Sequence, residues 1–102
     1  FDIRFLPNPY FVPELKDCTG LQEIVVKYVL ENPVTEEFLN RLTDFMKFLL
    51  PQYQKEGKAY LTIAFGCTGG KHRSVVIVNY LEGNLRKQGF IVRTHHRDVN
   101  KV

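Results

Sequence analysis

The sequence predicts an α/β fold with two or three layers, in which helices pack on a short, mostly parallel β-sheet. Three features of the chain predict this fold. Apolar residues in the first half recur with helical spacing, and residues 60–65 form an apolar run without polar alternation. That run is followed by a glycine-rich loop, a helical pattern and another strand pattern, the order of a right-handed βαβ unit. The length of 102 residues suits a single domain, residues 1–102.

The chain opens with a predicted strand over residues 1–6. Three apolar residues alternate there with Asp2 and Arg4, which is the period of two that is typical of a strand with one apolar face. Asp2 and Arg4 are therefore expected to point to the same side. The Pro-Asn-Pro sequence at residues 7–9 ends the strand, because proline lacks the backbone donor that a sheet requires.

Two helices are predicted before the middle of the chain. Thr19 and Gln22 have the spacing of a capping box at the start of the first helix, which the Asn-Pro pair at residues 32–33 ends. Thr35 is the expected N-cap of the second helix, and Pro51 is expected to kink or break it. The apolar stripe of this second helix predicts core packing by Phe38, Leu39, Leu42, Phe45, Met46, Leu49 and Tyr53.

The second half of the chain carries the predicted βαβ unit. Residues 60–65 form its first strand, and residues 90–94 form its last. Between them, the β-branched residues 74–78 are compatible with the return arm of a hairpin. We favour a helix, because apolar residues continue at helical spacing to Leu85 and Gly89 stands where a C-terminal cap belongs.

Composition indicates the cellular compartment of the protein. Two cysteines, Cys18 and Cys67, indicate reduced thiols in the cytoplasm rather than a disulfide framework. The sequence has no charged leader and no apolar run of roughly 20 residues, so membrane insertion is not predicted. We interpret a chain that begins with Phe1 in a strand pattern as a fragment of a longer protein.

Charge is distributed unevenly along the chain. Residues 71–102 carry seven lysines and arginines against two acids, whereas residues 1–70 carry seven against nine. The basic end favours an anionic partner such as phosphate or nucleic acid, although a solvated basic face without a partner is also common.

The segment GCTGGKHRS, residues 66–74, joins the predicted strand to the predicted helix. Its glycines allow backbone amides to approach a ligand closely, and free amides at a helix N-terminus favour an anion. Lys71 adds a positive charge, and Arg73 offers a planar set of donors that matches phosphate. We therefore predict an anion-binding loop that sulfate or phosphate can occupy, with no other cofactor. Further hydrogen-bonding side chains in the loop are Thr68, His72 and Ser74.

Two enzymatic interpretations of the loop differ in how well the sequence fits them. A nucleotide-binding P-loop is excluded, because the spacing of the glycines is one residue short and the lysine is followed by histidine. Cys67, five further residues, Arg73 and Ser74 do match the pattern of cysteine phosphatases, in which a thiolate attacks phosphorus and the arginine holds phosphate oxygens. A phosphatase also needs a general acid, for which Asp17 and Asp98 are candidates by position only.

The loop motif and the opening FDIRFLPNPY, together with TGL at residues 19–21 and YLT at residues 60–62, closely resemble the C-terminal domain of the RapZ/YvcJ family. These proteins are RNase adapters and nucleotide-binding proteins, and the resemblance covers essentially the whole chain. It implies a phosphofructokinase-like α/β module that binds RNA, forms homo-oligomers and is not an enzyme. Family members bind ATP or GTP through an N-terminal P-loop domain, which this sequence lacks. Enterobacterial members sense glucosamine-6-phosphate and deliver a small regulatory RNA to an endoribonuclease.

The resemblance also implies site residues. The sugar phosphate would contact Asp2, Arg4, Cys67, Thr68, Gly69, Gly70, His72, Arg73 and Ser74. RNA would contact Lys71, Arg73, Arg86, Lys87, Arg93, His95, His96, Arg97 and Lys101. As a further hypothesis, the Asp2 carboxylate pairs with the protonated amine of an aminosugar. No metal site is expected, because adjacent histidines on a strand face opposite sides. A purely structural dimerisation module, with neither ligand, remains the non-enzymatic alternative.

Overall fold

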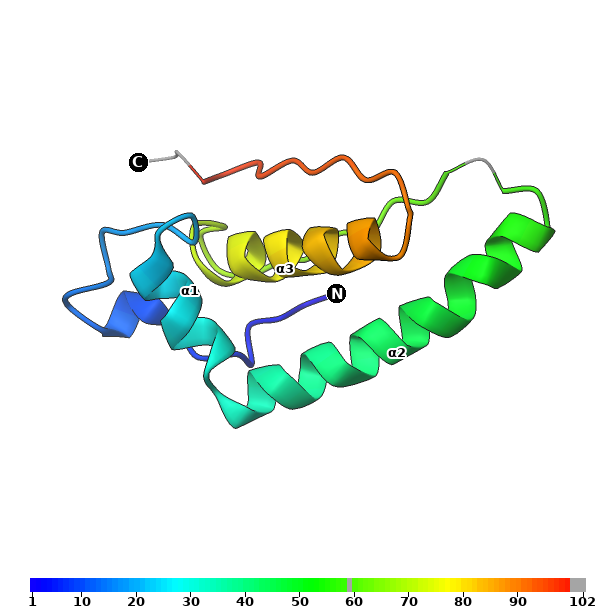
Figure 1. The fold of residues 1–102 in the computed structure, drawn as a ribbon. Coiled ribbons are helices and arrows are strands. Elements are labelled where there is room, and N and C mark those ends of the chain that lie inside the picture. Colours follow the sequence, from blue (N-terminus) through cyan, green and yellow to red (C-terminus); the bar gives the residue numbers. More distant parts are fainter. Residues whose placement is uncertain (59, 100–102) are drawn as a thin grey trace.

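The computed structural model describes residues 1–58 and 60–99, and within these ranges the chain is helical (Figure 1). It contains no β-sheet there, and a single isolated parallel bridge joins Asp2 to Gly66. The predicted α/β fold with a mostly parallel sheet is therefore wrong. The elements are the 3-10 helix η1 (Pro9–Phe11) and the α-helices α1 (Glu23–Leu30), α2 (Pro33–Lys55) and α3 (Arg73–Lys87).

The first predicted strand ends early because the chain turns. The amine of Phe1 donates to the Ala64 carbonyl at 2.7 Å, the Gly66 amide donates to Phe1 at 2.8 Å, and the Ile3 amide donates to Gly66 at 2.9 Å. These three bonds are the beginning of a parallel ladder. The Leu6 amide then donates back to the Ile3 carbonyl at 3.1 Å, so residues 3–6 form a turn instead of extending the ladder.

The last predicted strand, residues 90–94, forms no backbone hydrogen bond with residues 60–66 in the part of the chain that the structure describes. Residues 92–98, which we call the C-terminal strap, run back along α3 (Figure 1). Arg86 donates to the Val92 carbonyl at 2.7 Å, Thr94 donates to the Glu82 carboxylate at 3.2 Å, and His96 lies 2.9 Å from the Asn79 amide oxygen. Residues 60–66 and the strap both line a cavity of about 990 Å³. Because these side-chain bonds hold the strap to α3, its backbone does not pair with residues 60–66.

The ends of α1 and α2 can be compared with the caps and the proline break that the sequence predicts. The Thr19 amide donates to the Gln22 side chain at 2.7 Å, which is one of the two bonds of the predicted capping box. The helix start that the box predicts is wrong, because α1 begins at Glu23 and its N-cap is Gln22. α2 is capped by Asn32, whose side chain accepts from the Val34 amide, so the prediction of Thr35 as N-cap is wrong. The predicted break at Pro51 is also wrong, because α2 continues to Lys55.

The prediction of a helix rather than a hairpin after the loop is confirmed by α3. Its C-terminus is closed by Gly89, which has a φ of +90° and donates to the Arg86 carbonyl at 3.0 Å. The Phe90 amide donates to the Leu85 carbonyl at 3.1 Å. This pair of bonds is a Schellman motif, which favours glycine at the left-handed position.

The core is built around α3. Ile77 packs with Ile3, Leu6 and Leu39, and the C-terminal half of α3 packs on α2. A third cluster joins α3 to α1 through Val76. In the ranges that the structure describes, none of the helices is both long enough and apolar enough to cross a membrane.

Candidate functional site

The glycine-rich loop, residues 66–74, leads from the Asp2 bridge into the first turn of α3. Gly69 and Gly70 have φ values of +79° and +68°, which side chains of L-residues rarely tolerate. Within the described part of the chain, the backbone amides of Thr68, Gly69 and Gly70 donate no hydrogen bond. The loop therefore presents unused donors at a helix N-terminus, where the helix dipole favours negative charge.

Two cavities meet at this loop. The first, of about 430 Å³, is lined by Phe1, Asp2, Arg4, Gly66, Cys67 and Thr68. The second is the cavity of about 990 Å³ between residues 60–66 and the C-terminal strap, and it reaches Gly70, Ser74 and Asp98. Phe1, Gly66 and Cys67 line both cavities, so the two cavities adjoin at the start of the loop.

Two predicted ligand residues, Arg73 and His72, form hydrogen bonds with backbone carbonyls. Arg73 is only 3% exposed, and its guanidinium donates to the carbonyls of Arg4 at 2.6 Å and Leu6 at 3.3 Å. His72 is also buried, and its Nε2 lies 2.6 Å from the Cys18 carbonyl. Because a carbonyl can only accept, Nε2 carries the proton. Both side chains join the loop to the N-terminal third of the chain.

One buried donor of Arg73 has no partner among the described residues. This donor is its Nε. A buried donor without a partner costs free energy, but Arg73 is not among the residues that line the two cavities.

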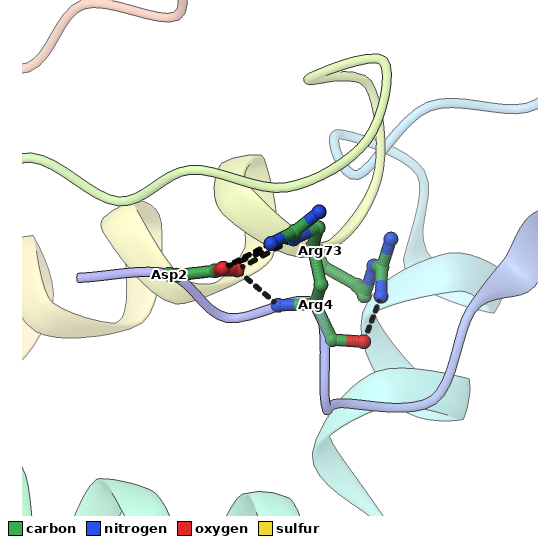
Figure 2. A network of polar contacts seen from close by, with 3 residues as sticks. All are labelled: Asp2, Arg4 and Arg73. Atoms are coloured by element: carbon green, nitrogen blue, oxygen red, sulfur yellow. Dashed lines mark hydrogen bonds and ion pairs between the residues drawn. The ribbon is translucent and has the colours of Figure 1, made fainter.

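Asp2 and Arg4 form an ion pair at the edge of the first cavity (Figure 2). The Arg4 side chain donates to both Asp2 oxygens at 2.7–3.0 Å, and the Arg4 amide donates to Oδ1 at 3.0 Å. The predicted orientation of both residues to the same side is realised by this pair. The hydrogen bonds from the Arg4 side chain, aided by that from its backbone, lower the pKa of Asp2 from 3.8 to about 2.

We predict that the Asp2 carboxyl titrates at pH about 2, which carbon-detected NMR can measure. Because its pKa in the folded state lies below the ordinary value, stabilisation by the pair is complete above pH 3.8 and is lost as the pH falls through 2. Arg4→Gln removes the side-chain bonds, so the pKa should rise part of the way to 3.8. A wild-type midpoint at 3.8 would contradict the pairing.

Cys67 lies at the N-terminus of α3. The Ser74 amide donates to its Sγ at 3.3 Å, which places the thiol beside the first turn of the helix. The arginine of the phosphatase pattern, Arg73, is instead bonded to the carbonyls of Arg4 and Leu6.

The residues predicted to bind RNA are distributed over three places. Lys71 is in the loop and is partly exposed, whereas Arg73 is buried. Lys101 lies outside the described residues. Arg86 and Lys87 are exposed in the last turn of α3, and the strap carries Arg93, His95, His96 and Arg97. Within the described ranges, no group of three or more His, Cys, Asp or Glu side chains could hold a metal ion.

Sequence reasoning missed three sets of contacts at the site, although it named Gly66 as the start of the loop and Asp98 as a candidate general acid. Phe1 and Gly66 line both cavities, because the N-terminus bonds to residues 64–66. Gly20 packs against the start of α3, and its amide donates to the Lys71 carbonyl at 2.7 Å. Asp98 lies over Gly70, where a Cβ built on the glycine would be 3.0 Å from the Asp98 Cβ. These are contacts between distant segments, and no local pattern indicates them.

Comparison with known proteins identifies the family of this chain. Residues 1–100 match the family model described as the RapZ C-terminal domain. A nucleotide-binding protein of Geobacter sulfurreducens is 57% identical over 100 residues, which cover 98% of this chain and 35% of the relative. A relative from Myxococcus xanthus is 55% identical over 100 residues, covering 98% of this chain and 35% of its own length. One from Desulforamulus reducens is 52% identical over 101 residues, with coverage of 99% and 34%.

The chain thus spans about a third of the length of the curated relatives it matches. The resemblance indicated by the opening motif and the loop motif is confirmed, and this chain belongs to the RapZ C-terminal domain family.

Proposed function

We propose that this chain is a sensor and adaptor domain, not an enzyme, that binds a phosphorylated aminosugar such as glucosamine-6-phosphate at the loop of residues 66–74. The observation that carries the proposal is the set of unused amides of Thr68, Gly69 and Gly70 at the N-terminus of α3. Two cavities adjoin these amides and have room for the rest of a sugar. Lys71 and the unpartnered Nε of Arg73 add positive charge close to the loop.

The second part of the proposal is RNA binding by the exposed basic residues of α3 and the strap. RNA helices are recognised mainly through phosphates, shape and 2′-hydroxyl groups, so a basic face of this kind is suitable. Arg73 is buried and would support the loop rather than contact RNA. Binding to a small structured RNA should weaken steeply as salt concentration rises, because each phosphate contact releases counterions.

For the complete protein, we propose the activities implied by the family. Relatives named as nucleotide-binding proteins are about three times as long as this chain, and we propose that ATP or GTP binding belongs to the region outside it. A homo-oligomer in the cytoplasm that presents RNA to an endoribonuclease or another protein is consistent with this arrangement.

The test of sugar-phosphate binding is calorimetric titration with glucosamine-6-phosphate beside inorganic phosphate. Lys71→Gln should weaken both by about fivefold, because it removes a positive charge near the loop. The matched control is Lys87→Gln, which removes the same charge at the other end of α3. Loss of RNA affinity without loss of ligand affinity is expected for the control. Absence of saturable binding by the wild-type protein would reject the sensor.

One contact favours the alternative of a cysteine phosphatase, namely the hydrogen bond from the Ser74 amide to Cys67 Sγ. Hydrolysis of an aryl phosphate by wild-type protein, compared with Cys67→Ser, separates the two proposals. We expect no turnover that depends on Cys67, because Arg73 is bonded to Arg4 and Leu6. Cysteine-dependent turnover would establish the enzyme.

A further inference from the structure

The helix α2 carries a second apolar stripe outside the core. Leu39, Leu42 and Met46 are buried and form the stripe that packs on the rest of the molecule. Phe45 and Phe48 lie on another side of the helix and are 50% and 63% exposed, so the prediction of Phe45 as a core residue is wrong. A helix on the surface of a globular domain usually has one apolar stripe, and the second stripe therefore indicates a further packing partner.

The second stripe runs along most of α2. Its members are spaced by four, seven and three residues, which places them on one side of the helix: Val34, Phe38, Phe45 and Phe48. Phe5 extends the stripe beyond the helix, because its ring meets that of Phe38 edge-on with the centroids 5.4 Å apart. α2 lies along one edge of the molecule (Figure 1), and these described residues line neither of the two cavities at the loop. The stripe is thus separate from the proposed ligand site.

The charges of α2 are divided between its two halves. Residues 33–44 carry three acids and one arginine, whereas residues 45–55 carry two lysines and no acid. Two copies of α2 that pack in antiparallel orientation place the acidic half of each against the basic half of the other. This charge complementarity favours a second copy of the chain as the partner, because the same stripe and the same charges recur on it.

The positions of Glu37 and Lys55 fit this arrangement. Lys55 follows Glu37 by 18 residues, which is five turns at about 3.6 residues per turn, so both lie on the same flank of the stripe. In an antiparallel two-fold pair, the same flank of both helices faces the same direction, and Glu37 therefore meets Lys55 of the partner subunit twice. Glu37 pairs within its own helix with Arg41 at 3.0 Å, but both side chains are exposed and such a pair contributes little.

The aromatic residues fit the same register. A two-fold axis between residues 46 and 47 sets Phe45 against Phe48 of the partner subunit. The same axis brings Glu37 within one residue of Lys55 of the partner subunit. One register thus satisfies the apolar stripe and the charges beside it.

We infer that the second stripe of α2 is a dimerisation surface, on which α2 of a second copy of this chain packs in antiparallel orientation. This inference deepens the proposed function, because it rests on the proposed homo-oligomer and names its interface.

The first experiment is sedimentation equilibrium of wild-type protein and Phe48→Glu. Wild-type protein should form a dimer, and Phe48→Glu should weaken it by about 100-fold, because two carboxylates enter an apolar contact in each dimer. Phe11→Glu is the matched control, since Phe11 is 79% exposed on η1 and should leave the dimer unchanged. Thermal unfolding of each variant verifies that it is folded.

A second experiment tests the antiparallel orientation by charge reversal. Lys55→Glu should weaken the dimer by about fivefold, because it sets two carboxylates opposite each other at both ends of the helix pair. Adding Glu37→Lys to the same chain restores opposite charges and should return the affinity to within about twofold of wild type. Lys47→Glu is the control, because Lys47 lies two residues from Phe45 and therefore on a different side of α2.

The outcomes separate the interface from the proposed homo-oligomer. A Phe48→Glu protein that dimerises as tightly as wild type, or one weakened no more than Phe11→Glu, would overturn the inference and leave the homo-oligomer with another interface. A double variant that does not regain the affinity lost in Lys55→Glu would overturn the antiparallel pairing. A wild-type protein that stays monomeric would reject both the interface and the homo-oligomer, whereas titration with glucosamine-6-phosphate decides ligand binding independently.

Discussion

Gly20→Ala is expected to lower the free energy of unfolding by about 3 kcal/mol, which is the upper end of the usual cost of overpacking a core. A Cβ at this position would lie 2.5 Å from the His72 carbonyl oxygen and 2.7 Å from the Val75 Cβ. Both atoms belong to the first turn of α3 or its N-cap, so no side-chain rotation can relieve the contact. The helix must move away, and the bond from the Gly20 amide to the Lys71 carbonyl would lengthen.

Urea and thermal denaturation measure this effect. For a domain of this size, the midpoint temperature should fall by about 12 °C or more. Gly83→Ala is the control, because Gly83 lies within α3 and nothing is within 4 Å of its added Cβ. That variant should gain about 0.5–1 kcal/mol through helix propensity. A Gly20→Ala protein as stable as Gly83→Ala would contradict the close approach to α3.

Arg73→Met is expected to lower the free energy of unfolding by about 2–3 kcal/mol. Methionine keeps most of the volume of the side chain but leaves the carbonyls of Arg4 and Leu6 without the donor that the guanidinium supplies at 2.6 and 3.3 Å. Removal of a buried charge has a favourable component, since the guanidinium is desolvated. We expect the loss to dominate, because two acceptors next to the core would remain unsatisfied.

The control for this prediction is another arginine of the same helix. Arg86 also donates to a carbonyl, that of Val92 at 2.7 Å, but its side chain is 55% exposed. Water can replace its contacts, so Arg86→Met should change the unfolding free energy by less than about 1 kcal/mol. Equal midpoints for both variants in chemical denaturation would show that the buried bonds of Arg73 make no net contribution.

The comparison of the two arginines bears on function as well as stability. The loop motif marks Arg73 as a phosphate ligand, yet its side chain fastens residues 4–6 to the start of α3. A loss of ligand binding in Arg73→Met would therefore reflect displacement of the loop as much as the loss of a direct contact. The charge of Lys71, for which no such contact exists among residues 1–58 and 60–99, is the cleaner probe of the site.

Local sequence patterns were sufficient to predict much of the helical structure and to identify the family. The helix after the loop, its glycine cap at Gly89 and the contact between Thr19 and Gln22 all follow from interactions within a few residues, which is why the sequence predicted them. The cap of α2 was missed because Asn32 competes with Thr35 for the same role, and both residue types are suitable caps. The opening motif and the loop motif identified the family without any structure.

The absence of a sheet from residues 1–58 and 60–99 and the composition of the site were decided by tertiary structure. A strand pattern specifies an extended chain with apolar faces, but a sheet also needs a neighbouring backbone within hydrogen-bonding distance. The turn after Ile3 and the attachment of the strap to α3 remove that neighbour, although residues 60–65 are as apolar as a buried strand. In the same way, contacts between segments distant in sequence bury Arg73 and bring Asp98 to Gly70. Such contacts depend on the path of the whole chain and have no signature in local spacing.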